Sequence, residues 1–137
     1  MRIMGIDYGD ARTGVAISDL LCTIVGSTQV IHSKNMDKTL QCIADLVTVN
    51  SVGKIVVGLP KNMDGTEGTR AEICKVFAKK LEELTGIDVA MWDERRTTVE
   101  AHNILSAHNY HGKKRKDTVD AVAASLILEG YLGFVGR

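Results

Sequence analysis

The chain has 137 residues, of which 45% are apolar, and this suits one domain over residues 1–137 with its own hydrophobic core. Seventeen Lys and Arg residues balance seventeen Asp and Glu residues, which excludes a general attraction to nucleic acid and leaves only local basic patches. Because no signal peptide or uninterrupted apolar stretch of membrane length is expected, we predict a cytoplasmic protein without a membrane partner. The widely spaced Cys22, Cys42 and Cys74 predict reduced, buried thiols.

The first sixty residues predict three antiparallel strands, a helix and a buried strand. Apolar runs at residues 2–6, 15–18 and 24–31 are joined by short links, as in a meander. Between residues 37 and 49 apolar residues recur at helical spacing. The unbroken apolar run at 54–60 is typical of a strand buried on both faces, and a parallel crossover would place it beside the first strand.

The rest of the chain predicts three more helices and one more strand. Capping-box sequences at 69–72 and 97–100 predict helices that extend to about 84 and about 108. Residues 87–92 predict the fifth strand, and the polar residues 109–116 predict a mobile basic loop. The last helix is expected to begin at Asp117. The predicted fold is therefore an α/β, five-stranded mixed sheet flanked by helices.

Asp7 is the first candidate for a functional residue. It lies at the end of the first strand, with Gly5 and Gly9 two positions away on either side. A strand end holds a carboxylate on rigid backbone at the rim of a sheet, and the glycines keep other side chains away from it. The alternative is that Asp7 only caps the following turn, and an isolated Asp-x-Gly sequence supports both interpretations about equally.

Acids after the fifth strand strengthen the functional interpretation of Asp7. Asp93 and Glu94 follow that strand, and parallel strands bring Asp7 and Glu94 to one edge, about 10 Å apart in backbone. Gly58, on the strand between them, leaves the gap free of a side chain. Carboxylates around such a gap can hold Mg²⁺ or Mn²⁺, and two ions about 4 Å apart can promote phosphodiester hydrolysis. Asp93 has an alternative role as an ion-pair partner of a neighbouring arginine.

The beginning of the last helix offers a third acid. Asp117 occupies the expected N-cap position and Asp120 the third helical position, so either acid could have a purely structural role. Asp120 is the better candidate for a metal ligand because Ala124 and Ile127 lie on its face of the helix. Asp117 and Asp93 remain alternative ligands.

Basic and amide side chains in the predicted loops are candidates for gripping a phosphate backbone, although such a run is more often a solvated loop. These residues are Arg12, Lys61, Asn62, Arg95, Arg96, Lys113, Lys114, Arg115 and Lys116.

Four ordered motifs, at residues 5–19, 57–65, 93–98 and 120–124, together resemble the YqgF family, also called RuvX. The resemblance implies a ribonuclease H-like fold of the Holliday-junction-resolvase group, with sheet order 3-2-1-4-5. It also implies metal-dependent nuclease activity, with Asp7, Glu94 and Asp120 as catalytic, metal-binding residues. Related resolvases carry the middle acid on the fourth strand, where this chain has Gly58-Leu59-Pro60, so Glu94 is a departure from them.

The resemblance implies a two-metal endonuclease that uses Mg²⁺ or Mn²⁺ in maturation of the 5′ end of pre-16S rRNA, in contact with ribosomal precursor particles. Two alternatives stay open: a Holliday junction resolvase that acts on branched DNA, and a non-catalytic nucleic-acid-binding module. The three acids favour an enzyme. Because phosphate contacts read charge and shape rather than base identity, RNA and branched DNA are not distinguished, and the oligomeric state is also left open.

Overall fold

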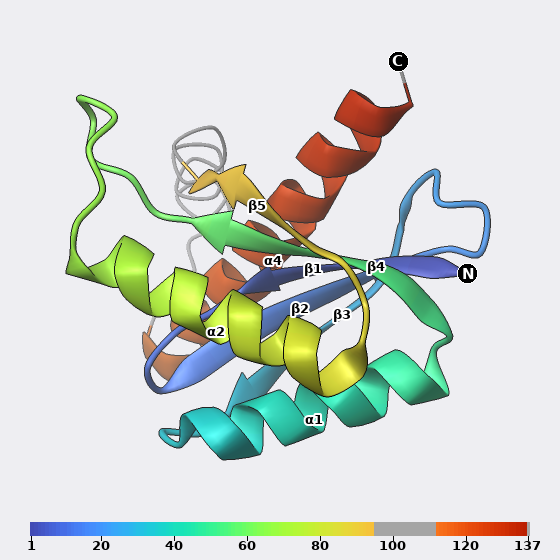
Figure 1. Ribbon diagram of the computed structural model, residues 1–137, viewed down its shortest axis with the longest axis horizontal. Coiled ribbons are helices and arrows are strands. Elements are labelled where there is room, and N and C mark those ends of the chain that lie inside the picture. The colour runs from blue at the N-terminus through green and yellow to red at the C-terminus, as the bar shows by residue number, and fades with distance from the viewer. Residues whose placement is uncertain (95–111, 137) are drawn as a thin grey trace.

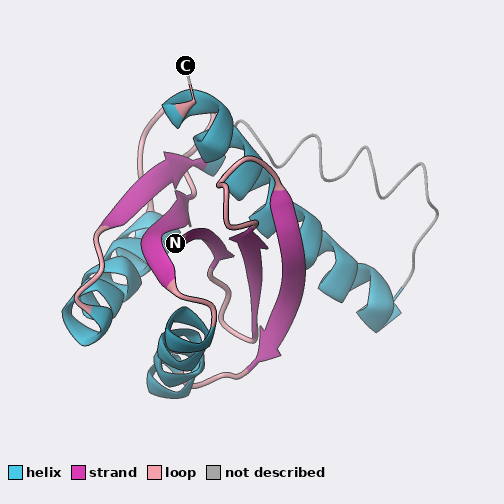
Figure 2. Ribbon diagram, turned by 90° about the vertical axis from the view of Figure 1, so that its right-hand side faces the viewer, coloured by secondary structure: helices cyan, strands magenta, loops and turns pink. Residues whose placement is uncertain are grey.

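The computed structural model describes residues 1–94 and 112–136, and it contains a five-stranded mixed sheet with helices on both faces (Figures 1 and 2). Residues 112–116 are described by their backbone. The elements are β1 (Arg2–Asp7), β2 (Arg12–Ser18), β3 (Val25–His32), α1 (Met36–Val49), β4 (Val52–Leu59), α2 (Thr69–Thr85), β5 (Val89–Asp93) and α4 (Gly112–Val135). The strand order β3-β2-β1-β4-β5 confirms the predicted fold class.

Strand pairing sets which residues meet at the edge of the sheet. Strand β1 is antiparallel to β2, with Asp7 opposite Gly14, and parallel to β4. Strand β5 continues the parallel part, with Asp93 beside Leu59 of β4. The carboxyl ends of β1, β4 and β5 therefore lie at one edge, as the sequence predicted.

The alternation of side chains along β1 divides the core into two layers. Met4 and Ile6 face α1 and α2 in a cluster that includes Phe77, whereas Ile3 faces α4 in a second cluster. Figure 2 shows α4 crossing the sheet on the side opposite to α1 and α2. Because positions two apart share a face, Asp7 lies on the same side of the sheet as Ile3 and Gly5 and thus on the side of α4.

Glycines in the strands allow α4 to approach the sheet closely. A Cβ atom at Gly5 would lie 2.8 Å from Cβ of Leu128, and one at Gly14 would collide with the carbonyl group of Asp120. A larger residue at either position would push the helix away. The close approach of α4 to Gly14 fixes the distance of Asp120 from β2, the strand that pairs with β1.

The helix ends agree only in part with the expected capping. At α2 the N-cap is Gly68 without a side-chain cap, because Thr69 is already helical, so the predicted capping box at 69–72 was wrong. Gly68 contributes its carbonyl oxygen, which accepts a hydrogen bond of 3.3 Å from the backbone N–H of Glu72. Gly86 ends α2 in the left-handed region, at φ 70°, as expected of a C-terminal glycine.

Helix α4 begins earlier than expected. It starts at Gly112 rather than Asp117, so the basic residues 113–116 lie in a helix and not in a loop. Lys and Arg are good helix formers, and Asp117 does not cap the helix because its carboxylate pairs with His32 of β3. The predicted helix at 97–108 lies outside the described residues.

One described segment, Asp117–Val135, is long and apolar enough to cross a membrane by length and composition, with a mean hydropathy of 1.5, where none was expected from the sequence. It belongs to α4, and its Ala124, Ile127 and Leu128 are buried against the sheet. Because a core helix passes the same test, the hydropathy is weak support for a membrane span.

The cysteines differ in exposure, so the prediction of three buried thiols was wrong for two of them. Cys74 is buried in the α2 layer, Cys22 is half-buried and Cys42 is exposed on α1. Burial raises the pKa of the Cys74 thiol to about 11. All three are free thiols, as expected.

Candidate active site

Asp7 and Glu94 meet above the strand that separates them. Asp7 ends β1 and Glu94 follows β5, and their carboxyl groups share a hydrogen bond. Glu94 lies over Gly58 of β4, where a Cβ atom would come within 2.8 Å of Cγ of Glu94 and 2.7 Å of Cδ1 of Ile127. The absence of a side chain at Gly58 therefore gives Glu94 the space to lie across β4 toward Asp7.

The surroundings of Asp7 disfavour its ionised form. Burial raises the pKa of Asp7 well above the ordinary value of 3.8, and the hydrogen bond with Glu94 and the charge of Glu94 raise that pKa further. The Arg70 guanidinium opposes this shift and lowers the pKa. Strongly perturbed carboxyl groups of this kind are concentrated at functional sites.

Asp120 lies on the same face of the sheet, beside this pair. Its carbonyl group lies over Gly14, the residue opposite Asp7 in β2, and Oδ2 of Asp120 accepts a hydrogen bond of 2.9 Å from Nε of Arg12. Burial raises the pKa of Asp120; the hydrogen bond from Arg12 lowers it, and the nearby charge of Asp7 raises it.

The chemistry of these donors suits a hard divalent cation, because carboxylate oxygens are the ligands that Mg²⁺ and Mn²⁺ prefer. A cation between Asp7 and Glu94 would relieve the repulsion from Glu94 that opposes ionisation of Asp7. Within residues 1–94 and 112–136, however, no three Asp, Glu, His or Cys side chains are already gathered closely enough to enclose an ion. Asp120 is instead held by Arg12.

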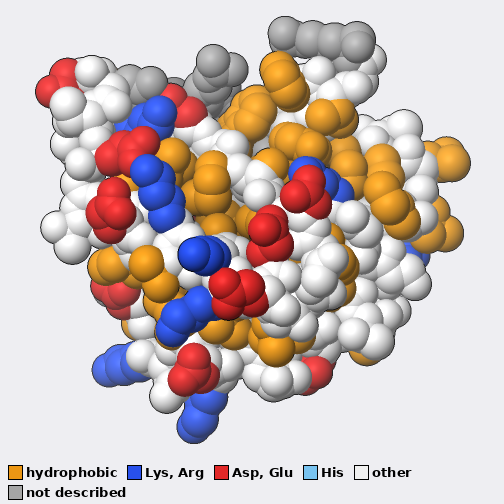
Figure 3. Space-filling model, viewed as in Figure 1, with side chains coloured by type: hydrophobic (Ala, Val, Ile, Leu, Met, Phe, Trp, Pro, Cys, Tyr) orange, Lys and Arg blue, Asp and Glu red, His pale blue; other side chains and the backbone are white. Residues whose placement is uncertain are grey.

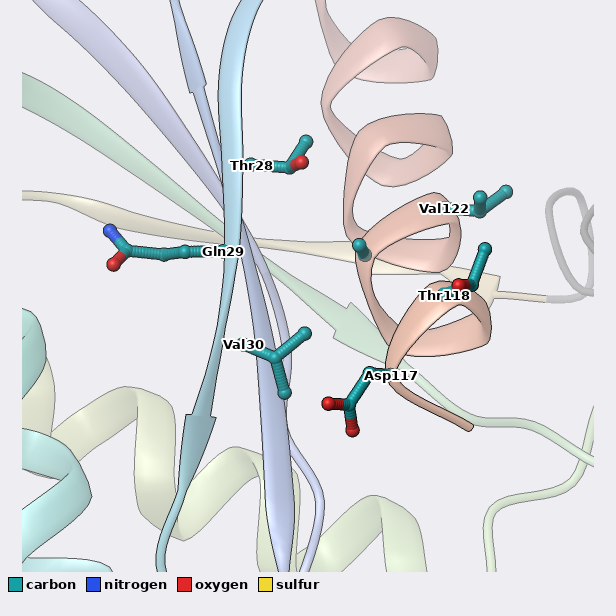
Figure 4. Close-up of a pocket in the computed structure, with 7 residues that line it drawn as sticks. Thr28, Gln29, Val30, Asp117, Thr118 and Val122 are labelled. Carbon is teal, nitrogen blue, oxygen red and sulfur yellow. The ribbon is translucent and has the colours of Figure 1, made fainter. Parts of the chain in front are cut away.

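The two alternative acids lie at different places. Asp93 is the last residue of β5, directly before Glu94. Asp117 turns toward β3, where its Oδ2 lies 3.1 Å from Nε2 of His32. Figure 4 shows Asp117 beside Val30, at the rim of a pocket between β3 and α4. Oδ1 of Asp117 is buried and has no hydrogen-bond partner in the described part of the chain.

The predicted phosphate-binding residues are scattered. Arg12 pairs with Asp120. Nζ of Lys61 lies 4.0 Å from Oε2 of Glu67. The side-chain amide of Asn62 donates a hydrogen bond to Oγ1 of Thr66, so Asn62 stabilises its own loop. Arg95 and Arg96 lie outside the described residues. Lys113, Lys114, Arg115 and Lys116 belong to the N-terminal turns of α4.

Arg70 was not among the predicted site residues. From the first turn of α2 it donates hydrogen bonds to the carbonyl oxygen of Tyr8 (2.6 Å) and to Oδ1 of Asp10 (2.7 Å). The only signal in the sequence was its place at the start of a helix that follows a polar loop. The contact itself spans 62 positions and depends on the packing of α2.

A mixed sheet in this order, with acids at the end of β1, directly after β5 and on α4, defines a protein of the ribonuclease H-like class. Two solved structures share the fold. Thermus thermophilus RuvC in complex with a Holliday junction substrate has a TM-score of 0.65 at 10% identity, covering 100% of this chain and 97% of that one. The fowlpox virus resolvase in complex with Holliday junction DNA has a TM-score of 0.59 at 12% identity, covering 100% of both chains.

Residues 1–133 match the RuvX family, described as Holliday junction resolvase, and the chain belongs to that family. A relative from Halothermothrix orenii is 47% identical over 137 residues, which cover 100% of this chain and 98% of the relative. One from Carboxydothermus hydrogenoformans is 42% identical, covering 100% and 99%. Both carry the name "Putative pre-16S rRNA nuclease".

These findings confirm the predicted family and make the chain a nuclease, a hydrolase that acts on phosphodiester bonds. Membership of this nuclease family also implies, in general, dependence on a divalent metal and action on nucleic acid. The roles of the individual side chains remain predictions.

Proposed function

We propose that the chain is a Mg²⁺- or Mn²⁺-dependent endonuclease that matures the 5′ end of pre-16S rRNA in the cytoplasm. The observation that carries this proposal is the hydrogen-bonded carboxyl pair of Asp7 and Glu94 above Gly58. The names of relatives that are 42% and 47% identical support the substrate.

In this proposal Asp7, Glu94 and Asp120 hold the metal, and Arg12 and the basic start of α4 contact phosphate groups. The metal, when bound, would activate water and stabilise the leaving oxygen. The contribution of the chain is to keep three carboxylates on one face of the sheet, where a shared cation would draw them together. Arg12 lies between the two functions, because it contacts Asp120 and is close enough to solvent to meet a phosphate.

A four-way DNA junction is the second candidate substrate. The description of the family as Holliday junction resolvase favours it. We would compare cleavage of a 16S precursor with cleavage of a four-way junction in the same Mn²⁺ buffer. We expect faster cleavage of the precursor, at the position where the leader meets the mature 5′ end. Cleavage of the four-way junction alone would replace the substrate in our proposal.

The variant Asp7→Asn tests the role of the acid. Asn keeps the size of Asp but cannot supply the charge that holds a divalent ion, so we expect cleavage to fall by orders of magnitude while nucleic-acid binding persists. Cleavage rate and substrate affinity would be measured across a Mn²⁺ titration. Asp45→Asn, the same change on the exposed surface of α1, is the matched control and should cleave like the parent. Parent-like cleavage by Asp7→Asn would contradict the mechanism.

A further inference from the structure

Arg70 holds the turn that follows Asp7 from a distant part of the chain. One guanidinium group bonds both the Tyr8 carbonyl oxygen (2.6 Å) and the Asp10 carboxylate (2.7 Å). Its Cζ also lies 5.4 Å from the centroid of the Tyr8 ring, within the range of a cation–π contact. Three features of one short turn thus depend on a single side chain.

Helix α2 holds Tyr8 at two points. The Tyr8 ring stacks on Phe77 with centroids 4.2 Å apart, and Arg70 lies two helical turns before Phe77 on the same helix. The ring is buried and the carbonyl oxygen is bonded, so both the side chain and the backbone of Tyr8 are fixed to α2. Tyr8 is the residue directly after Asp7, and its backbone position limits where the Asp7 carboxyl group can lie.

The two hydrogen bonds of Arg70 differ in importance. Asp10 is 82% exposed, and ion pairs at such exposure are weakened by water and salt. The hydrogen bond to the Tyr8 carbonyl oxygen is partly buried and charge-assisted. It holds the backbone of the residue that directly follows Asp7, the proposed metal ligand. The contact with Tyr8 is therefore the one that matters for the site.

We propose that Arg70 is a positioning residue for the metal site: by bonding the Tyr8 carbonyl it fixes the backbone beside Asp7, and thereby sets the affinity for the divalent ion without touching that ion. The inference rests on the proposed function, because it takes Asp7 to be a metal ligand. Outer contacts of this kind are often as important to a metal site as its ligands.

The test compares Arg70→Gln, Arg70→Lys and Asp10→Ala with the parent. Mn²⁺ affinity would be measured by calorimetry without substrate, together with the Mn²⁺ concentration that half-saturates cleavage, the substrate affinity in EDTA and the melting temperature. Arg70→Gln should weaken Mn²⁺ binding roughly tenfold or more. Arg70→Lys, which keeps one donor for the Tyr8 carbonyl, should recover part of that loss, and Asp10→Ala should change Mn²⁺ binding by less than about twofold.

Several outcomes would overturn the inference. Parent-like Mn²⁺ binding by Arg70→Gln with a lower melting temperature would make Arg70 a purely structural contact. A weaker substrate affinity in EDTA with unchanged Mn²⁺ binding would make it a phosphate contact. If Asp10→Ala weakened Mn²⁺ binding as much as Arg70→Gln, the ion pair rather than the Tyr8 carbonyl would be responsible.

Calorimetry separates this inference from the proposed function. If the parent binds Mn²⁺ but cleaves neither substrate, the proposed function fails while the effect of Arg70 on metal affinity is still measured. If Arg70→Gln does not fold, the Arg70→Lys variant decides: the inference then requires it to bind Mn²⁺ more weakly than the parent, and parent-like binding would contradict it.

Discussion

A carboxyl group that is partly buried next to another carboxyl group is costly to ionise, and Asp7 is in that situation. Its pKa in the folded protein lies above the ordinary value of 3.8, so over the pH range between the two values the folded chain keeps a proton that the unfolded chain has released. The folded state binds more protons there, and its stability falls as the pH rises through that range.

This gives a prediction for stability in the absence of metal. In EDTA, the free energy of unfolding of the parent should fall with rising pH above 4 more steeply than that of Asp7→Asn, which has no carboxyl group to titrate. Urea unfolding at a series of pH values would measure both slopes. Added Mn²⁺ should reduce the difference, because the cation favours the ionised acid. Equal slopes for the two proteins would show that Asp7 ionises without penalty.

At this scale the sequence predicted the acids better than their partners. Asp7 ends one strand and Glu94 follows another, and the strand pattern is local, so their common edge could be inferred. The partner of Asp120 is Arg12, 108 positions away, and that contact depends on how α4 lies across β2. The sequence around Arg12 or Asp120 contains no local signal that predicts this contact.

Among the elements, β4 contributes to the site through Gly58, which has no side chain. Gly58→Ala should place a Cβ atom 2.8 Å from Cγ of Glu94 and 2.7 Å from Cδ1 of Ile127. Overpacking of this kind costs about 1–3 kcal/mol, and Glu94 is the neighbour with more freedom to move. We therefore expect cleavage to fall at least tenfold, with a moderate loss in the free energy of unfolding measured in urea.

The matched control for this change is Gly133→Ala in α4, where a Cβ atom would meet nothing within 4 Å. Alanine is favoured over glycine in a helix by about 1 kcal/mol, so this variant should be slightly more stable than the parent and cleave equally well. If Gly58→Ala cleaved as well as Gly133→Ala, the space above Gly58 would have no part in catalysis.

The elements themselves were largely predictable because their periodicity is local. The strand order 3-2-1-4-5 was implied by the family resemblance, and the short links between the first three strands agree with it. The beginnings of α2 and α4 were less predictable, because α2 begins at Thr69 after Gly68 and α4 begins at Gly112, five residues before the expected cap at Asp117. Asp117 is drawn to His32 of β3, a tertiary contact that overrides its local preference for an N-cap.

For the molecule as a whole, zero net charge means that nucleic acid must be bound by a local group of basic side chains rather than by the net charge of the protein. Figure 3 shows Lys and Arg interspersed with Asp and Glu on the face that carries α2. The basic residues 113–116 lie instead at the N-terminal end of α4, where the helix dipole also favours anions. That end of α4 also carries Asp120.

Changing Lys113, Lys114, Arg115 and Lys116 to Ala should weaken binding of nucleic acid and flatten its salt dependence. Each lost phosphate contact should reduce the slope of log K against log salt by about 0.9 for duplex DNA and about 0.7 for single strands. Affinity would be measured by fluorescence anisotropy from low to moderate salt.

The control removes the same charge from the opposite face, by changing the exposed Lys34, Lys38, Lys79 and Lys80 of the α1 and α2 side to Ala. This variant should keep the salt dependence of the parent. If both variants lowered the slope equally, the effect would come from total charge and not from the start of α4.

The close contact of α4 with Gly5 and Gly14 also has a consequence for the chain while it is being synthesised. During synthesis the ribosome delivers β1 first and α4 last, so a nascent chain that already contains Asp7 and Glu94 still lacks Asp120 and the helix that covers those glycines. If the three acids act together, as we propose, the unfinished polypeptide cannot cut RNA. A nuclease of ribosomal precursors would thus be harmless to the ribosome that is making it until its final helix has been released and has docked.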